Sequence, residues 1–233
     1  ISADSGNMTE VLSAADSACY VAKDLGRNRV HIYQPDDDAL ARRHGEMQWV
    51  QRINDGLDDN RFRLYGQHMV PLIAGAPTFC EILLRLHEDG AELIPPNAFI
   101  PAAERYYLMP NIDRWVVARA LAMLGRSHWH EDTSDRPVMY AINLSGQSLC
   151  DDQFLDFVVA NLHESRVLPS RICFEITETA AIANLTRAMT FIARLKDMGC
   201  RFALDDFGSG LSSFAYLKSL PVDYLKIAGN FIQ

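Results

Sequence analysis

The run RFALDD, residues 201–206, reads as a short buried strand that ends in two adjacent aspartates. A helical pattern precedes it at 184–198, and another strand-like run, RICFEITE, lies before that helix at 171–178. Gly199 stands at the C-cap position of the helix, where a left-handed residue commonly ends one. A helix between two strands is typical of parallel strands joined by a crossover, so this region predicts an α/β fold.

The same alternation extends outward along the chain. The other strand-like runs are FRLYGQHMVPL (62–72), FCEILLRL (79–86), VMYAINLS (138–145) and VDYLKIA (222–228). Helical patterns at 111–125 and 152–164 lie between some of them. We therefore expect an α/β sheet or barrel whose parallel strands are joined by helices.

Polar side chains stand within or at the end of successive strand-like runs. They are Glu81, Asn143, Glu175, Asp205, Asp206 and Lys226. In a closed (β/α)8 barrel the carboxyl ends of the strands converge on one face, where catalytic groups gather. A single buried carboxylate has an ordinary interpretation as a hydrogen-bonded core group. A whole series of them leaves many buried charges to be compensated, so we predict one shared functional site.

Composition narrows the classes of partner. The chain has 233 residues, 48% of them apolar, and a formal net charge of −8. This charge argues against binding a nucleic-acid polymer, which needs a basic face. No stretch reaches the roughly 20 apolar residues of a membrane span. Five scattered cysteines without a C-x-x-C pair are typical of a reducing compartment. We expect a cytoplasmic segment without direct membrane contact, from a parent protein that could still be anchored to the inner membrane.

The amino-terminal stretch reads as the end of a domain. Residues 8–24 have helical apolar spacing, Gly26 stops the helix, and RNRVHIY alternates like a short strand. One helix and one strand cannot enclose a core alone. The predicted organisation is therefore a tail at 1–35, a linker and leading helix at 36–60, and a main domain at 61–233.

The strand ends resemble, in collinear order, the motifs of the EAL domain family. The matching pieces are the opening L-Y-x-Q at Gln67, E-A-L with its following L-L-R at 81–85, F-I-P-x-A-E at 99–104, N-L-S at 143–145, E-I-T-E at 175–178, D-D-F-G-T-G-Y-S-S at 205–213 and P-V-D-x-L-K-I at 221–227. Each piece alone is weak, but the ordered set is specific. The resemblance implies a (β/α)8 TIM-like barrel, here apparently truncated before its last strands.

The resemblance also implies a function: hydrolysis of the bacterial second messenger cyclic di-GMP to linear pGpG by a metal-dependent phosphodiesterase. Two Mg²⁺ or Mn²⁺ ions would activate water and stabilise the attacking and leaving oxygens. The metal ligands that it implies are Glu81, Asn143, Glu175, Asp205 and Asp206. The catalytic residues that it implies are Lys226, Asp206 and Glu178, of which the last braces the loop 207–213. Contacts to the ligand are expected from Gln67, Arg85 and Leu83.

Residues 15–29 resemble the end of a GGDEF diguanylate cyclase domain, AD-x-A-x-Y-x-AK-x-x-GRNR. The signature pentapeptide of that family is absent from the chain, so the resemblance implies no cyclase activity. A solvated amphipathic helix followed by a basic turn fits the same residues. The partners implied are cyclic di-GMP, a GGDEF domain in cis, and a second copy in an EAL homodimer.

Two alternatives remain open. The chain could be a catalytically inactive EAL domain that acts as a cyclic di-GMP receptor, as the departures from the family pattern at Ile82, Leu211 and Ala228 allow. Such domains usually lose metal ligands, whereas all the strand-end residues are present here, which favours the enzyme. The other alternative is an unrelated metal-dependent barrel enzyme acting on a different anion, which requires the ordered motifs to be coincidental.

Overall fold

The computed structural model describes residues 38–73, 75–88, 93–126, 138–208 and 216–231, with isolated positions before them at 8, 11, 15, 18, 30 and 32. The chain divides into two units, Ile1–Ile53 and Asn54–Gln233. Apart from those isolated positions, the expected GGDEF-like tail lies outside the described residues. Its resemblance and the boundaries at 35 and 60 therefore stay predictions.

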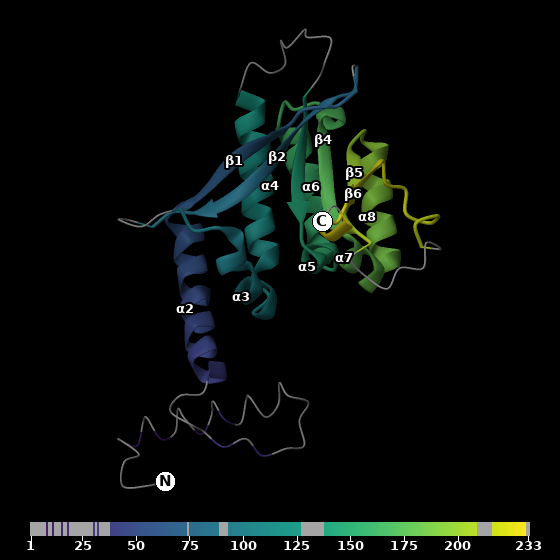
Figure 1. Ribbon diagram of the computed structural model, residues 1–233. Helices are drawn as coiled ribbons and strands as arrows, with labels where there is room; N and C mark the ends of the chain where they lie inside the picture. Colours follow the sequence, from purple (N-terminus) through teal and green to yellow (C-terminus); the bar gives the residue numbers. More distant parts are fainter. Residues whose placement is uncertain are drawn as a thin grey trace. The chain divides into compact units, whose positions relative to one another are not determined.

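One sheet organises the second unit (Figure 1). Its described strands lie side by side in sequence order and are β1 (Phe62–Met69), β2 (Thr78–Leu86), β3 (Val138–Leu144), β4 (Ile172–Thr177), β5 (Arg201–Phe207) and β6 (Tyr224–Ile227). Strands β2 to β6 pair in parallel. The predicted α/β class is confirmed, and among the described strands the sheet is open, with β1 and β6 at its edges.

The first strand pair corrects the expectation of parallel strands throughout. Strands β1 and β2 are antiparallel, with Gln67 opposite Glu81 and Arg63 opposite Arg85. Only the short segment between Met69 and Thr78 connects them. A parallel connection needs a crossover of about a dozen residues or more, so this pair forms a hairpin.

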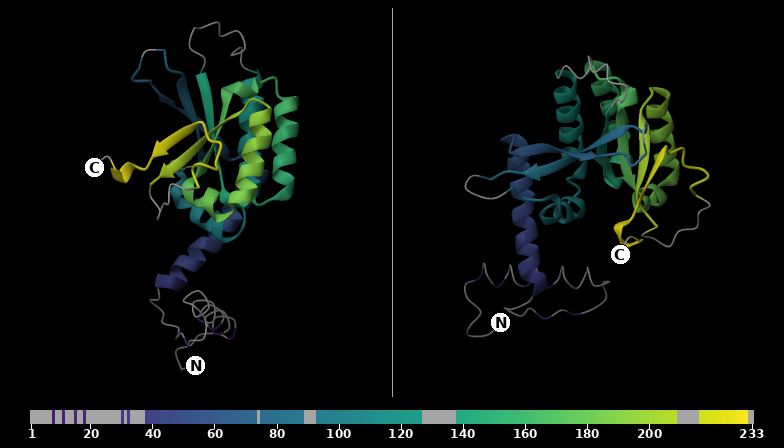
Figure 2. Two further views of the ribbon diagram at one scale, coloured as in Figure 1. Left: turned by 90° about the vertical axis from the view of Figure 1, so that its right-hand side faces the viewer. Right: turned by 45° about the horizontal axis from the view of Figure 1, so that its top comes forward.

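Helices cover one face of the sheet (Figures 1 and 2). The helical elements are α2 (Asp38–Asp58), η1 (Pro96–Ala98), α3 (Ile100–Arg105), α4 (Met109–Arg126), α5 (Gly146–Leu149), α6 (Asp152–Glu164), η3 (Pro169–Arg171), α7 (Glu178–Ala183), α8 (Leu185–Asp197) and η4 (Gly229–Phe231). The long helices α4, α6 and α8 match the three predicted from periodicity. No helix in the described ranges is long and apolar enough to cross a membrane.

Aromatic rings fill the layer between helices and sheet. The ring of Phe191 on α8 lies 6.1 Å from that of Phe154 on α6 and 6.2 Å from that of Phe202 on β5. Phe202 in turn contacts Phe174 on β4, with ring centroids 5.7 Å apart. Residues 172–176 of β4 are all buried, as expected for a strand in the centre of a sheet. This packing holds β4 and β5 firmly, and with them the polar residues near their carboxyl ends.

Short turns join these strand ends to helices. Strand β3 is followed at once by Ser145, whose hydroxyl caps α5 by accepting the Ser148 N–H. Strand β4 ends at Thr177, which caps α7 by accepting the Ala180 N–H. Side-chain oxygens satisfy backbone donors that a helix start leaves without partners, so the chain turns within one residue of each strand.

Candidate active site at the strand ends

Three strands place carboxylates around one lysine on a fourth strand. Lys226 on β6 donates hydrogen bonds from Nζ to Glu175 Oε2 on β4 at 2.6 Å, to Asp205 Oδ2 on β5 at 3.1 Å and to Glu81 Oε2 on β2 at 3.2 Å. Asn143 on β3 joins them by donating from Nδ2 to Glu81 Oε1 at 2.8 Å. The structure thus brings together five of the residues singled out in the sequence. We refer to them as the Lys226 cluster.

The Lys226 cluster holds more negative than positive charge. Only 2% of the Glu175 side chain is exposed. Burial, with the neighbouring charges of Glu81 and Asp205, raises the pKa of Glu175 to about 7, although Lys226 opposes the shift. Burial disfavours the charged form of Lys226, but the hydrogen bonds and charges of these three carboxylates outweigh it and raise its pKa above the ordinary value. One ammonium therefore serves three carboxylates, and the cluster can accept further positive charge.

The donor set of the Lys226 cluster fits a hard divalent cation. As the side chains stand, no group of three or more His, Cys, Asp or Glu residues within the described ranges is arranged to hold a metal ion. The three carboxylates instead converge on the Lys226 ammonium, so the fold already balances their charge with a cation of its own. Carboxylate oxygens with one amide oxygen are the ligands that Mg²⁺ and Mn²⁺ prefer.

The adjacent residues Asp205 and Asp206 differ in backbone conformation and in contacts. Pairing between β5 and β6 is irregular from Leu204 to Phe207, so Asp205 and Asp206 fall on a bulge. Asp205 contacts Lys226, whereas Asp206 is exposed and has a left-handed φ of 52°. Bulges next to active sites commonly redirect a side chain. Asp206 contacts the Lys226 cluster through its backbone, whose N–H donates to Asp205 Oδ1 at 2.9 Å.

Glu178 connects α7 to both sides of the segment that follows β5. Its side chain is buried, and Oε2 accepts the Gly208 N–H at 2.8 Å while Oε1 accepts the Tyr216 hydroxyl. The predicted brace to the loop 207–213 concerns residues that are described only at 207 and 208. Tyr216 is a partner that the sequence analysis missed, because nothing in its surroundings distinguishes it from an ordinary loop aromatic.

The predicted ligand contacts lie on the hairpin. Gln67 is the cross-strand partner of Glu81, and Leu83 and Arg85 follow Glu81 at alternate positions of β2. Residues two apart on a strand, and residues directly opposite each other, share one face. Gln67 is exposed, and half-buried Arg85 donates from a guanidinium nitrogen to Leu84 O at 2.7 Å. All three residues therefore stand on the face of the sheet that carries Glu81.

A pocket of about 600 Å³ opens beside the Lys226 cluster. Asn143 belongs to both, and the other lining residues come from β2, η1, α3, α4, the β3–α5 turn, the end of β4, and α7. Its lining is mostly apolar, with Leu83, Ile100 and Met109 among the residues, and it includes a few polar groups such as Gln147. An apolar pocket with a few polar groups, next to perturbed carboxyls, is the usual form of a small-molecule site.

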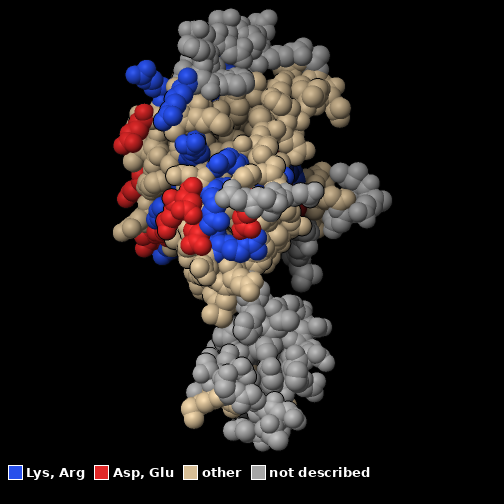
Figure 3. Space-filling model, turned by 90° about the vertical axis from the view of Figure 1, so that its left-hand side faces the viewer, with Lys and Arg blue, Asp and Glu red and all other residues tan. Residues whose placement is uncertain are grey.

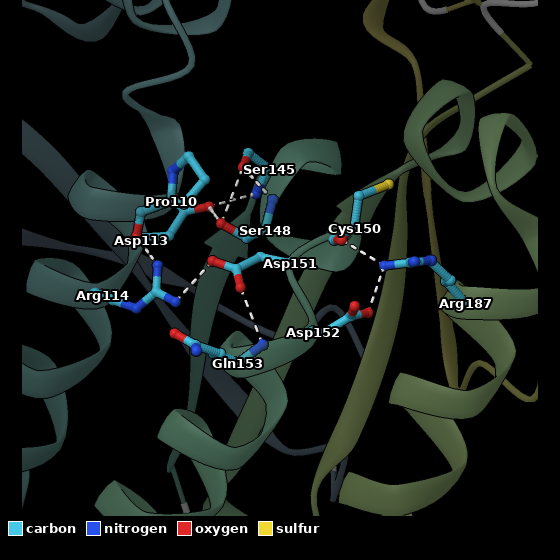
Figure 4. Close-up of polar contacts among 10 residues, drawn as sticks. All are labelled: Pro110, Asp113, Arg114, Ser145, Ser148, Cys150, Asp151, Asp152, Gln153 and Arg187. Atoms are coloured by element: carbon cyan, nitrogen blue, oxygen red, sulfur yellow. Dashed lines mark hydrogen bonds and ion pairs between the residues drawn. The ribbon is translucent and has the colours of Figure 1, made fainter.

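The sequence analysis also missed Asp113 on α4. Its carboxylate is buried, and Oδ2 accepts the Ser145 N–H at 2.9 Å and the Ser148 hydroxyl at 2.6 Å (Figure 4). Burial raises the pKa of Asp113 above its ordinary value, although these hydrogen bonds oppose the shift. One signal was available: Asp113 follows Ile112 and precedes Val116 on the apolar stripe of the helix, where a solvated carboxylate is not expected.

Charge on the outer surface is mixed. In the described part of the face shown in Figure 3, Lys and Arg side chains are interspersed with Asp and Glu. Among the ion pairs of the described residues, the Arg61 guanidinium lies 3.5 Å from the Asp59 carboxylate and 3.7 Å from that of Asp55.

Fold and site together define a class of protein: an α/β protein with a mainly parallel sheet and an acidic site at the carboxyl ends of its strands. The family follows from sequence comparison. The chain belongs to the EAL domain family, whose sequence profile matches residues 50–233.

Relatives of this family are similar over most of the chain. The cyclic di-GMP phosphodiesterase PdeB of Shewanella oneidensis is 39% identical over 231 residues, which cover 97% of the chain and 26% of that protein. The chain therefore spans about a quarter of the length of this relative.

Solved structures give the same assignment. The EAL domain of FimX from Pseudomonas aeruginosa bound to c-di-GMP is 30% identical with a TM-score of 0.71, covering 79% of the chain and 73% of that structure. The c-di-GMP complex of the PaMucR phosphodiesterase is 31% identical with the same TM-score, covering 79% of the chain and 74% of that structure.

Proposed function

We propose that this chain carries the hydrolytic site of a cyclic di-GMP phosphodiesterase, which opens the cyclic dinucleotide to linear pGpG. The observation that carries the proposal is the Lys226 cluster, in which three carboxylates from separate strands share one ammonium next to a ligand-sized pocket. Membership of the EAL family supports it, as do the relatives named as cyclic di-GMP phosphodiesterases.

Metal dependence follows from the donor set. Glu81, Asn143, Glu175 and Asp205 would hold Mg²⁺ or Mn²⁺, with Asp206 close enough along the chain to contribute to a second ion. Bound divalent cations supply an activated water and stabilise the developing charge on the phosphodiester oxygens. A bound cation would also lower the raised pKa of Glu175 and so favour its ionised form.

The protein's own side chains position the substrate. Lys226 is charged at neutral pH, and its carboxylate partners raise its pKa further, so it can offset negative charge on the phosphoryl oxygens. Arg85 carries a guanidinium, whose planar geometry matches a phosphate, on the same face as Glu81. Gln67 and Leu83 flank Glu81 on the hairpin and would contact the nucleotide. The apolar pocket beside Asn143 suits a planar base.

The proposal also covers the compartment, the oligomeric state and the neighbouring domain. We expect a cytoplasmic EAL homodimer with a GGDEF domain in cis, and we expect Glu178 to hold the loop after β5 in the arrangement that permits turnover. Co-purification of two differently tagged copies would test the dimer directly.

The experiment is turnover of cyclic di-GMP by the full-length protein with Mg²⁺ or Mn²⁺, and with a chelator as the control. Formation of pGpG that the chelator abolishes would establish the phosphodiesterase. Binding of cyclic di-GMP without turnover would replace it by a receptor and direct attention to Leu211 and Ala228. Absence of both would overturn the proposed function.

A further inference from the structure

A buried carboxylate outside the Lys226 cluster holds the turn that carries one of its members. Asp113 is 4% exposed and projects from α4 toward the turn between β3 and α5. Its Oδ2 accepts one hydrogen bond from the backbone of Ser145 at 2.9 Å and one from the hydroxyl of Ser148 at 2.6 Å. Ser145 stands two residues after Asn143, so Asp113 fixes the backbone at the point where the strand leaves the site.

The same turn is held from the opposite side. A Cβ at Gly146 would come 3.0 Å from the Cβ of Ala180 on α7, which is tighter than ordinary contact. The turn is therefore confined between α4 and α7. Within it the Ser145 and Ser148 hydroxyls lie 3.2 Å apart, and the Ser145 hydroxyl caps α5. Both donors that face Asp113 lose their acceptor if the carboxylate is removed, and unsatisfied buried donors destabilise the arrangement that contains them.

We infer that Asp113 is a positioning residue that fixes the orientation of Asn143 toward the cation held by Glu81 and its neighbours. The inference rests on the proposed function, because it assigns Asn143 to that cation. Partners of a ligand residue commonly change metal affinity by about 10- to 100-fold when they are removed. A displacement of the β3–α5 turn would be transmitted to Asn143 through a single intervening residue, Leu144.

The chain offers a matched control on the same helix. Arg114, the next residue of α4, forms an ion pair with Asp151 at 2.6 Å and so ties the helix to the start of α6 (Figure 4). This contact has a similar length and a similar structural role, but it does not touch Ser145 or Ser148. Arg114→Gln therefore reports the effect of loosening α4 while the hydrogen bonds from Ser145 and Ser148 to Asp113 stay in place.

The test is the affinity of the full-length protein for Mn²⁺ without nucleotide, measured by electron paramagnetic resonance, together with amide hydrogen exchange over residues 143–149. Asp113→Leu fills the space without an acceptor and is expected to weaken Mn²⁺ binding about tenfold and to speed exchange in that segment. Asp113→Asn keeps an oxygen acceptor and is expected to restore both. Should the leucine variant not fold, Ser148→Ala removes one of the two hydrogen bonds and is expected to shift affinity in the same direction.

Two results would contradict the inference, and they are distinguishable. If the wild type and Asp113→Leu bind Mn²⁺ equally, or if Arg114→Gln weakens binding as much, Asp113 has only a structural role and the proposed function is untouched. If the wild type binds no Mn²⁺ at all, the proposed metal-dependent function fails and the role of Asp113 fails with it.

Discussion

Two ion clusters of opposite composition lie close together at strand β6, one around Asp223 and one around Lys226. Just before the strand, Asp223 is one carboxylate that accepts hydrogen bonds from Lys196 at 2.9 Å, from Arg201 at 3.1 Å and from the Phe202 N–H at 2.9 Å. Within the strand, Lys226 is one cation surrounded by three carboxylates. The two clusters are three residues apart in sequence, yet one has an excess of donors and the other an excess of acceptors.

The direction of the pKa shifts shows what this difference means. Burial raises the pKa of Asp223, but its hydrogen bonds to Lys196, Phe202 and Arg201 outweigh burial and lower the pKa below the ordinary value. The Asp223 cluster is therefore stable as it stands. In the Lys226 cluster, by contrast, burial and the neighbouring carboxylates raise the pKa of Glu175. The Lys226 cluster holds three carboxylates and one ammonium, so it can take up a further cation, whereas Asp223 already has two cations as partners.

Replacing a carboxylate of the Lys226 cluster should have the largest effect. Glu81→Ala is expected to reduce hydrolysis by about a thousandfold, since the contribution of a bound metal is several kcal/mol and each 1.4 kcal/mol is roughly tenfold in rate. Some binding of cyclic di-GMP should remain. The measurements are pGpG formation and calorimetric binding in the full-length protein, with Asp223→Asn as the control. Undiminished turnover in Glu81→Ala would contradict the metal-ligand role of Glu81.

Removing the charge of Lys226 should make the stability of the protein depend on added Mg²⁺. Lys226→Met leaves three carboxylates without their ammonium, and loss of one partner of a buried pair destabilises by about 3 kcal/mol. Mg²⁺ no longer competes with an ammonium in this variant, so it should raise the melting temperature more than in the wild type. Lys196→Met is the control, because Asp223 keeps Arg201. An equal rise in melting temperature with Mg²⁺ in the two variants would contradict the claim that the Lys226 cluster binds cations and the Asp223 cluster does not.

Replacing Asp223 should affect stability and not chemistry. Asp223→Asn is expected to lower the free energy of unfolding by about 2 kcal/mol at neutral pH, as for hydrogen bonds to charged groups. Because the folded pKa of Asp223 is below its unfolded value, its contribution is complete above the unfolded pKa and is lost as pH falls through the folded pKa. Urea denaturation from pH 7 to pH 2 should therefore show a gap between the two proteins that is constant above about pH 4 and narrows below it. A gap that stays constant over the whole range would mean that Asp223 does not act through its charge.

An exposed ion pair gives the smallest expected effect. Arg187 contacts Asp152 at 2.7 Å, where the side chains are 44% and 86% exposed, and it also donates to Cys150 O. Exposed pairs contribute at most about 1 kcal/mol, so Arg187→Gln should change stability by roughly 0.5 kcal/mol. Salt titration of the melting temperature measures this. A loss of stability as large as that of Asp223→Asn would show that burial does not decide how much an ion pair contributes in this protein.

Much of the fold was predictable because the strands are buried and their ends are polar. Period-two runs and intervening apolar stripes located β3, β4 and β5 with α4, α6 and α8, and the polar residues that interrupt those runs are the ones that meet at Lys226. The antiparallel first pair was not anticipated, since strand order alone does not reveal direction. The short connection from Met69 to Thr78 was the overlooked signal.

The supporting residues were harder to predict. Asp113 lies far from Asn143 in sequence, and only the packing of α4 against the β3–α5 turn brings its carboxylate to Ser145. Its place on the apolar stripe of α4 indicates that Asp113 is buried, but periodicity does not identify its partner. Asp205 and Asp206 look equivalent in sequence, and only the bulge between Leu204 and Phe207 gives them different positions.

The most direct test of the central claim is equilibrium binding of Mn²⁺ to the full-length wild-type protein, Glu175→Gln and Asp223→Asn. If the Lys226 cluster is a cation site, the wild type and Asp223→Asn should bind Mn²⁺ with equal affinity, and Glu175→Gln should bind it at least about tenfold more weakly. Equal binding by all three proteins, or no binding by the wild type, would contradict the account.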